Sequence, residues 1–218
     1  MIRNFKRTAA IFGIVAATST ALVACSESNE SDSADGGSDS VEVSGDLSGE
    51  GASSQKSAMS VFEKAFLNEY PDANFSYTSS GSGAGVKAFN GGTVDFAGSD
   101  SALKEDKGEV EAAKERCDGN DAWHLPTTIG PVAIAYNLGD TEVNLSTDTL
   151  AKIFKGEITK WNDDAIKAEN EGTDLPDKNI TVIFRSDESG TSDNFQKFLT
   201  AATGNWDSEG KQFPDAVG

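Results

Sequence analysis

The sequence predicts an α/β fold in which the strands of a parallel sheet alternate with helices. Strand-like segments, Gly/Ser-rich loops and helical patterns follow one another in that order, and the succession repeats along the chain. Residues 127–136 form an apolar run of the kind found in strands buried on both faces of a parallel sheet. Residues 179–184 alternate as a strand does, and a hydroxyl-rich loop follows them.

The first elements follow from spacing and from the residues that end each segment. Residues 45–54 are expected to hold a short strand and a Gly/Ser turn. Met59, Phe62 and Phe66 then fall on one helical face, which predicts a helix that ends at Pro71. We expect this apolar stripe to lie in the core.

The next segments repeat the pattern. Phe75 and Tyr77 alternate with polar residues as in a strand, and the Gly-rich loop 78–85 leads into a short helix. Residues 93–97 predict a further strand, after which a charged amphipathic segment continues to about Cys117.

The second half contains two further helices before the last strand. Residues 147–155 predict a helix ended by Gly156, and residues 161–168 predict another. The strand at 179–184 leads into a loop that begins with Arg185 and is expected to open a helix.

The N-terminal residues are predicted to be a targeting segment and not part of the fold. A basic stretch at 3–7 precedes the apolar residues 11–24, which are fewer than the roughly 20 apolar residues that a transmembrane helix needs. Small residues before Cys25 resemble a bacterial lipobox. We therefore expect residues 1–25 to be a lipoprotein signal peptide, with Cys25 as the lipidated first residue of the mature protein; a non-cleaved anchor is the alternative.

Residues 26–46 consist mostly of Ser, Asp, Glu and Gly, so they cannot bury enough apolar surface to become ordered. We predict a disordered tether between the membrane and the domain. The formal net charge of −18 argues against binding nucleic acid or an acidic membrane through bulk electrostatics. An anionic ligand would have to be held by local groups, which is feasible because unit charges 4 Å apart interact by about 4 kcal/mol at an effective dielectric of 20.

Hydroxyl and glycine residues recur where a strand is expected to end and a helix to begin. These segments are 52–54, 80–83, 98–100 and 189–191. In open α/β sheets ligands bind at the carboxyl ends of the strands, where helix N-termini present N–H donors and partial positive charge. Arg185 adds a fixed cation. Together these features predict a site for a small tetrahedral anion.

These motifs resemble the phosphate-binding proteins of the ABC phosphate importer, the PstS family. The resemblance extends from about residue 49 to 203 and rests on Gly-Ala-Ser-Ser at 51–54, Gly-Ser-Gly-Ala-Gly-Val-Lys at 81–87, Thr-Val-Asp-Phe-Ala-Gly-Ser-Asp at 93–100, Leu-Pro-Thr-Thr-Ile-Gly-Pro-Val at 125–132, Lys-Trp-Asn-Asp at 160–163 and Arg-Ser-Asp-Glu-Ser-Gly-Thr-Ser at 185–192. It implies a two-lobe periplasmic-binding-protein architecture of type II, incomplete at the C-terminus, with residues 47–126 in the first lobe and 127–218 in the second.

The resemblance also implies the function and the residues that carry it. The chain is expected to capture inorganic phosphate outside the cytoplasm, while anchored to the membrane by lipid, and to deliver it to an ABC permease without catalysis, cofactor or metal. The implied phosphate-binding residues are Ser53, Ser54, Ser82, Asp100, Arg185, Ser189, Gly190 and Thr191. Family members often carry Phe in place of Ser54, which leaves its side-chain role open. Asp187 is expected to pair with Arg185 and orient it.

Asp100 predicts selectivity for phosphate over sulfate. Protonated phosphate can donate a hydrogen bond to a carboxylate, whereas sulfate at neutral pH has no proton, so its lone pairs would face those of Asp100. Two local alternatives are that Asp100 only caps a helix and that Arg185 and Asp187 form only a surface ion pair.

Other ligands and functions stay open as alternatives. A different oxyanion, such as sulfate or molybdate, fits the same motifs. A secreted phosphatase with Ser189 or Ser82 as nucleophile is opposed by the lack of a Gly-x-Ser-x-Gly elbow and by the single histidine, His124, which we expect to be structural. Trp123 and Trp161 are expected to pack and not to stack on a ligand.

Overall fold

The computed structural model describes residues 42–214, which belong to one unit of the chain that spans residues 41–218. The predicted signal peptide at 1–25, the lipidation of Cys25 and most of the predicted linker at 26–46 lie outside the described residues. The first strand begins at Gly45, two residues inside the predicted linker. The predicted division into lobes at residue 127 stays a prediction.

Within residues 42–214, three parallel strands form one sheet, which confirms the predicted α/β class. They are β1 (Gly45–Gly51), β2 (Ala73–Ser79) and β3 (Phe96–Gly98), in the order β2-β1-β3. Central β1 pairs along its whole length with β2, and its last three residues pair with β3. The strand predicted at 93–97 corresponds to β3, which is shorter than predicted and begins three residues later.

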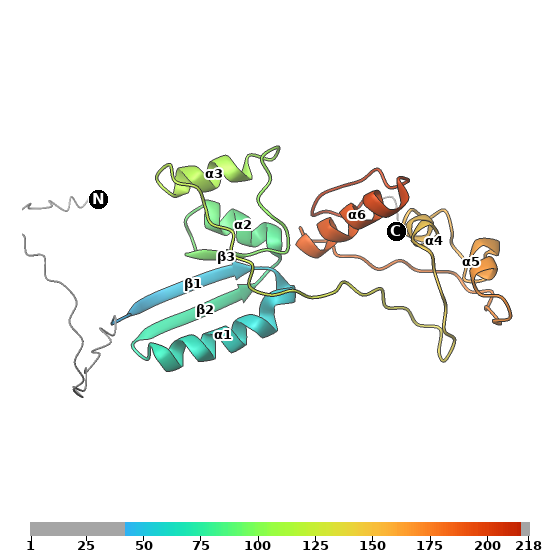
Figure 1. The fold of residues 1–218 in the computed structure, drawn as a ribbon, viewed down its shortest axis with the longest axis horizontal. Coiled ribbons are helices and arrows are strands. Elements are labelled where there is room, and N and C mark those ends of the chain that lie inside the picture. The colour runs from blue at the N-terminus through green and yellow to red at the C-terminus, as the bar shows by residue number, and fades with distance from the viewer. Residues whose placement is uncertain (1–41, 215–218) are drawn as a thin grey trace, which may run out of the picture. The chain divides into compact units, whose positions relative to one another are not determined.

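The helices of this region follow the strands as predicted. They are the 3-10 turn η1 (Ser53–Gln55), α1 (Lys56–Glu69), α2 (Ser82–Asn90) and α3 (Glu109–Arg116). The chain moves from β1 out to β2 through α1 and then back past β1 to β3 through α2. Because parallel crossovers are right-handed, these opposite directions place α1 and α2 on opposite faces of the sheet, as Figure 1 shows.

The apolar face of α1 is only partly in the core. Met59 is buried, and Phe66 packs against Phe75 of β2 at a ring-centroid distance of 6.0 Å. Phe62 is 38% exposed, so the prediction that it lies in the core was wrong. It lines a groove of about 820 Å³, whose apolar walls include Phe75, Phe96 and Trp123.

The described part of the second half, up to residue 214, contains three helices. They are α4 (Thr147–Phe154), α5 (Asp164–Glu169) and α6 (Gly190–Thr203). Each begins after a side chain that accepts a backbone N–H bond, namely Ser146, Asp163 and Ser189. Such caps satisfy N–H groups that a helix leaves without carbonyl partners in its first turn.

These helices pack into two hydrophobic clusters. One contains Ala151, Leu199, Trp206 and Phe213, and the other contains Ile153, Ile158, Ile166 and Leu175. Trp161 packs against the second cluster, as predicted. Trp123 is 86% exposed, so its predicted packing role was wrong among the described residues.

Two predicted strands of the second half have no ladder among residues 42–214. Residues 127–136 are irregular and exposed, and Ile129 is fully accessible, which contradicts the prediction of a buried strand. A buried strand needs neighbours that take up its N–H and C=O groups, and the described residues place no strand beside this run. At 179–184 the predicted alternation is present, because Ile180, Val182 and Phe184 face the clusters while Ile183 is exposed, but only Asn179 forms a bridge.

Among the described helices, none combines the length and the apolar character that crossing a membrane would require.

Removing the side chain of Leu199 tests the first cluster. Leu199 is completely buried, so Leu199→Ala should lower the free energy of unfolding by about 2–5 kcal/mol through lost burial and a residual cavity. The matched control is Ile183→Ala at an exposed position, which should change it by less than about 0.5 kcal/mol. Urea unfolding of the full chain measures both, and equal effects of the two variants would contradict this packing.

Candidate functional site

The site lies where two loops leave the sheet in opposite directions. In the order β2-β1-β3, the chain leaves β1 toward one side and reaches β3 on the other, and such a switch point forms a crevice at the carboxyl ends of the strands. Ser54 follows β1 and Asp100 follows β3. The Ser54 hydroxyl donates to Asp100 Oδ1 at 2.7 Å across this point. The predicted first and third loop segments therefore meet.

The N-terminus of α6 joins them from the far end of the chain. Thr191 Oγ1 donates to Asp100 Oδ2 at 2.8 Å, and Asn194 Nδ2 donates to the Asp100 carbonyl at 2.7 Å. Gly190 makes this approach possible, because a Cβ there would lie 2.6 Å from Ser82 Oγ and 2.9 Å from Asp100 Cβ. Ser189 caps the helix by accepting a bond from Ser192 N at 3.3 Å.

The N-terminus of α2 supplies the fourth predicted segment. Ser82 is almost completely buried, and its Oγ accepts a bond of 3.2 Å from the Asp100 backbone N–H. Gly83 N donates to the Glu188 carbonyl at 2.9 Å, which holds α2 against the loop before α6. Two helix N-termini, each with free N–H groups and partial positive charge, thus lie at one place.

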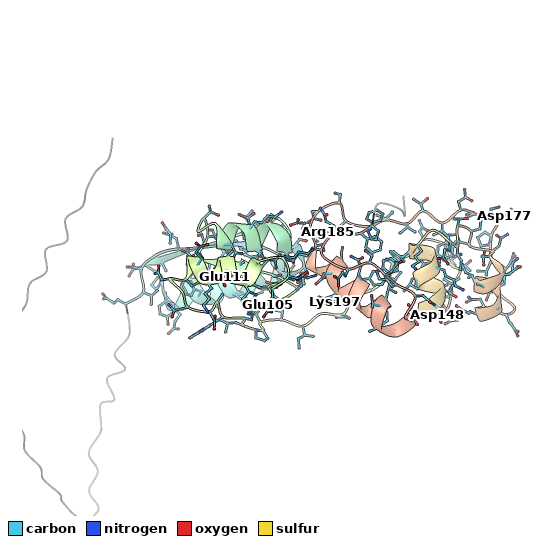
Figure 2. All side chains as sticks on the ribbon, turned by 90° about the horizontal axis from the view of Figure 1, so that it is seen from above. Glu105, Glu111, Asp148, Asp177, Arg185 and Lys197 are labelled. Carbon is cyan, nitrogen blue, oxygen red and sulfur yellow. The ribbon has the colours of Figure 1, made fainter. Side chains whose placement is uncertain are left out.

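Arg185 is the cation of the site (Figure 2). Its Nη1 donates to Ser53 Oγ at 2.7 Å, its Nε donates to Asp187 Oδ1 at 2.7 Å, and its Nη2 pairs with Asp187 Oδ2. The structure thus brings together all eight predicted binding residues and Asp187. The bond to Ser53 links the Arg185–Asp187 pair to the loop after β1, while both side chains stay more than a third exposed.

Asp100 does not cap a helix, so that alternative was wrong. The next helix, α3, begins at Glu109 with Gly108 as its N-cap residue. Asp100 instead accepts hydroxyl donors from Ser54, after β1, and from Thr191, in the first turn of α6. The charged residues between Asp100 and Gly108 had suggested a longer helix than the structure contains.

The electrostatics of the site favour an ionised Asp187. The hydrogen bond from Arg185 lowers the pKa of the Asp187 carboxyl, outweighing the opposite effect of burial. Tyr77 responds in the other direction: burial first, and then the charges of Asp100 and Glu50, raise the pKa of Tyr77 to about 12. Its hydroxyl therefore stays protonated and donates to the Ala52 carbonyl at 2.9 Å.

Sequence reasoning missed several residues that position the loops. Tyr77 carried a signal, since strand alternation places it on the same face as Phe75, but nothing in the sequence pairs its hydroxyl with Ala52. Asn194 and Glu188 flank the α6 motif and had no distinguishing pattern. His124, predicted to be structural, is exposed and accepts a bond of 3.3 Å from Leu103 N.

Comparison with known proteins decides the family. The model of the PBP superfamily domain matches residues 29–217. The chain belongs to the PBP superfamily. Its parallel sheet, in which the strand order reverses direction at β1, agrees with the fold that the sequence predicted for this superfamily.

Individual members of the superfamily are close in sequence. The phosphate-binding protein PstS2 of Mycobacterium bovis is 47% identical over 209 residues, which cover 93% of this chain and 56% of the relative. The phosphate-binding protein PstS3 of the same organism is 43% identical over 226 residues, covering 99% of this chain and 60% of the relative. The chain therefore spans less than two thirds of the length of these relatives.

A solved structure shares the fold. The crystal structure of a phosphate-bound substrate-binding protein from Clostridium perfringens, assigned to a phosphate ABC transporter, aligns with a TM-score of 0.53 at 23% identity. The alignment covers 79% of this chain and 60% of the other. It supports the PBP fold independently of the sequence matches.

The Arg185–Asp187 pair predicts how Asp187 titrates. In the folded chain its pKa should lie below the ordinary value of about 3.9, so the pair stabilises the fold above that pH and the contribution is lost as pH falls through the lower folded pKa. Arg185→Gln should raise the pKa of Asp187, as followed by carbon NMR of the carboxyl. Asp177, which pairs with Lys160 instead, is the control and should not change. An unaltered Asp187 titration in the variant would refute the pairing.

Proposed function

We propose that this chain captures inorganic phosphate between the loops that meet at Asp100 and Arg185, and that it delivers phosphate to an ABC permease. The observation that carries the proposal is the convergence of one guanidinium, one carboxylate and two helix N-termini at the carboxyl ends of β1 and β3. The names of the mycobacterial relatives support phosphate as the ligand.

Local groups can hold the anion despite the acidity of the chain. Arg185 has five N–H donors, of which three are engaged with Ser53 and Asp187, so two are left for a ligand. The hydroxyls of Ser54 and Thr191 now bond to Asp100 and can rotate toward phosphate oxygens. The free N–H groups that open α2 and α6 add donors with partial positive charge. Distant surface carboxylates matter less, because salt screens them beyond about 8 Å.

Asp100 gives the site a reason to prefer phosphate. Its carboxylate lies among the hydroxyl donors of Ser54 and Thr191, and hydrogen phosphate can donate its proton to one of the two oxygens. Sulfate would place lone pairs against them, and a buried polar mismatch costs about 1–3 kcal/mol for neutral groups and more for charged ones. We therefore infer phosphate as the ligand in preference to sulfate or molybdate.

We infer a binding protein and not an enzyme. Ser82 Oγ accepts a bond from Asp100 N, and Ser189 Oγ caps α6, so both candidate nucleophiles are occupied in structural bonds. His124, the single histidine of the chain, accepts a bond from Leu103 N and is exposed. A nucleophilic serine would need an adjacent base, and neither serine has one among its described contacts.

The proposed location rests on the N-terminal sequence. A basic stretch, a short apolar segment and Cys25 support export, cleavage and lipidation of this cysteine. The polar residues that follow would then tether the binding domain to the outer face of the membrane, where a permease could receive the phosphate. Two lobes that close over the ligand would be the state that the permease recognises.

Removal of the guanidinium tests the site. Arg185→Ala should weaken phosphate binding by about 10- to 100-fold, because a charge-assisted hydrogen bond contributes about 1.5–3 kcal/mol. Calorimetry on the full chain in mild detergent measures the affinity. Lys160→Ala removes an exposed cation from a remote ion pair and should leave binding unchanged. Unchanged phosphate binding in Arg185→Ala would remove Arg185 from the site.

Substitution of the acceptor tests selectivity. Asp100→Asn turns one acceptor oxygen into a donor amide, so it should weaken phosphate binding and strengthen sulfate binding, narrowing their affinity ratio by about tenfold or more. Competition between the two anions in the calorimeter gives the ratio. Asp177→Asn, at an exposed carboxylate, is the matched control. Identical ratios in wild type and Asp100→Asn would assign discrimination to another group.

A further inference from the structure

A closed ring of charged and backbone contacts lies next to the binding loops. Ser189 N donates to the Lys211 carbonyl at 2.9 Å, and Lys211 Nζ donates to Glu109 Oε1 at 2.6 Å. Glu109 Oε2 accepts from Lys104 N at 2.9 Å, and Lys104 Nζ donates to Asp193 Oδ1 at 2.8 Å. Asp193 N donates to the Ser189 carbonyl at 3.1 Å, and this bond completes the ring of contacts. We call these five residues the ion-pair ring.

The ring is buried to an extent that is unusual for ion pairs. The Asp193 side chain is 0% exposed and that of Lys211 is 7% exposed. Burial alone would raise the pKa of the Asp193 carboxyl, but the ammonium groups of Lys104 and Lys197 outweigh it and hold that pKa below its usual range. Lys197 Nζ lies 2.7 Å from Asp193 Oδ2, so the buried carboxylate has an ammonium partner at each oxygen.

The ring connects the two parts of the chain that form the site. Lys104 lies four residues after Asp100, and its partner Asp193 is 89 residues further along, in the first turn of α6. Glu109 opens α3, and its partner Lys211 is 102 residues away. Ser189 belongs both to the ring and to the predicted phosphate-binding residues. The ring therefore constrains where the N-terminus of α6 lies relative to the loop after β3.

We propose that the ion-pair ring is a positioning device that holds the N-terminus of α6 at the distance from Asp100 that phosphate binding requires. The proposal rests on the proposed function of the site. Buried ion pairs add little stability over apolar residues of similar size, because desolvation offsets their attraction, whereas their bonds impose specific distances and directions. Lys104, Glu109, Asp193 and Lys211 act through Ser189 and Asp100 without touching the ligand.

Replacing both members of one ion pair distinguishes an effect on the placement of the α6 N-terminus from an effect on the stability of the fold. Lys104→Met with Asp193→Leu removes both charges, while Lys197 is half exposed and can turn to water. We expect a similar melting temperature, faster hydrogen exchange of the amides at 186–195 and about tenfold weaker phosphate binding, the size of a typical coupling between sites. As a conservative control, the single variant Lys104→Arg keeps a cation beside Asp193 and should bind phosphate with nearly the wild-type affinity.

Two further double variants complete the experiment. Glu109→Gln with Lys211→Met breaks the other ion pair and should produce the same changes. Lys160→Met with Asp177→Leu removes an exposed pair of equal charge and should alter neither hydrogen exchange at 186–195 nor phosphate affinity. All measurements use the full chain in mild detergent, with calorimetry for inorganic phosphate and mass spectrometry for hydrogen exchange without phosphate.

The outcomes separate the ring from the function. Hydrogen exchange and affinity equal to wild type in the Lys104–Asp193 double variant would overturn the proposal, and so would unfolding of both ring variants, since the ring would then serve folding. If the wild-type chain binds no phosphate, the proposed function fails. In that case, hydrogen exchange measured without phosphate still tests the role of the ring. Faster exchange at 186–195 in the Lys104–Asp193 double variant supports the positioning role, and unchanged exchange refutes it.

Discussion

The carboxylate of Asp100 is the contact on which the arrangement of the crevice depends. Each loop around it is by itself an ordinary Gly/Ser turn. Asp100 gathers them, because its two oxygens accept from Ser54 and Thr191 while its N–H donates to Ser82. The parallel order of the strands brings the loop after β1 to this residue, and the missing side chain of Gly190 lets α6 approach it. The hydroxyl donors of Ser54 and Thr191 thus lie around the Asp100 carboxylate. A protonated oxyanion could accept from such donors and donate its own proton to the carboxylate.

The charge of the site is balanced over short distances in an acidic chain. Arg185 is oriented by Asp187 and reaches Ser53, so its guanidinium is held against the loop after β1 while its side chain stays 38% exposed. Behind it, each buried acid of the ion-pair ring has an ammonium partner within 2.8 Å. At such distances the local pairs dominate the field at the crevice, and the net charge of −18 acts mainly on encounters with other molecules.

Local sequence signals predicted the elements that depend on nearby residues. The helix that Ser146 caps follows from apolar spacing, and the positions of the four loop segments follow from hydroxyl and glycine residues where strands end. The errors occur where distant partners decide the outcome. Residues 127–136 have the composition of a buried strand but find no strand neighbours among residues 42–214. The pairing of Lys104 with Asp193 joins residues 89 apart in the chain, and no short pattern encodes it.

The exposed apolar residues have a consequence for how the molecules behave toward each other in solution. Trp123, Leu125 and Ile129 present accessible apolar surface on a chain that carries a net charge of −18. At low ionic strength, mutual repulsion keeps molecules apart, since the screening length is about 30 Å at 0.01 M salt. At 1 M salt it shrinks to about 3 Å, and apolar stretches on two molecules can meet before repulsion acts. We therefore expect the protein to stay dispersed in buffers of low ionic strength and to self-associate when the salt concentration is raised.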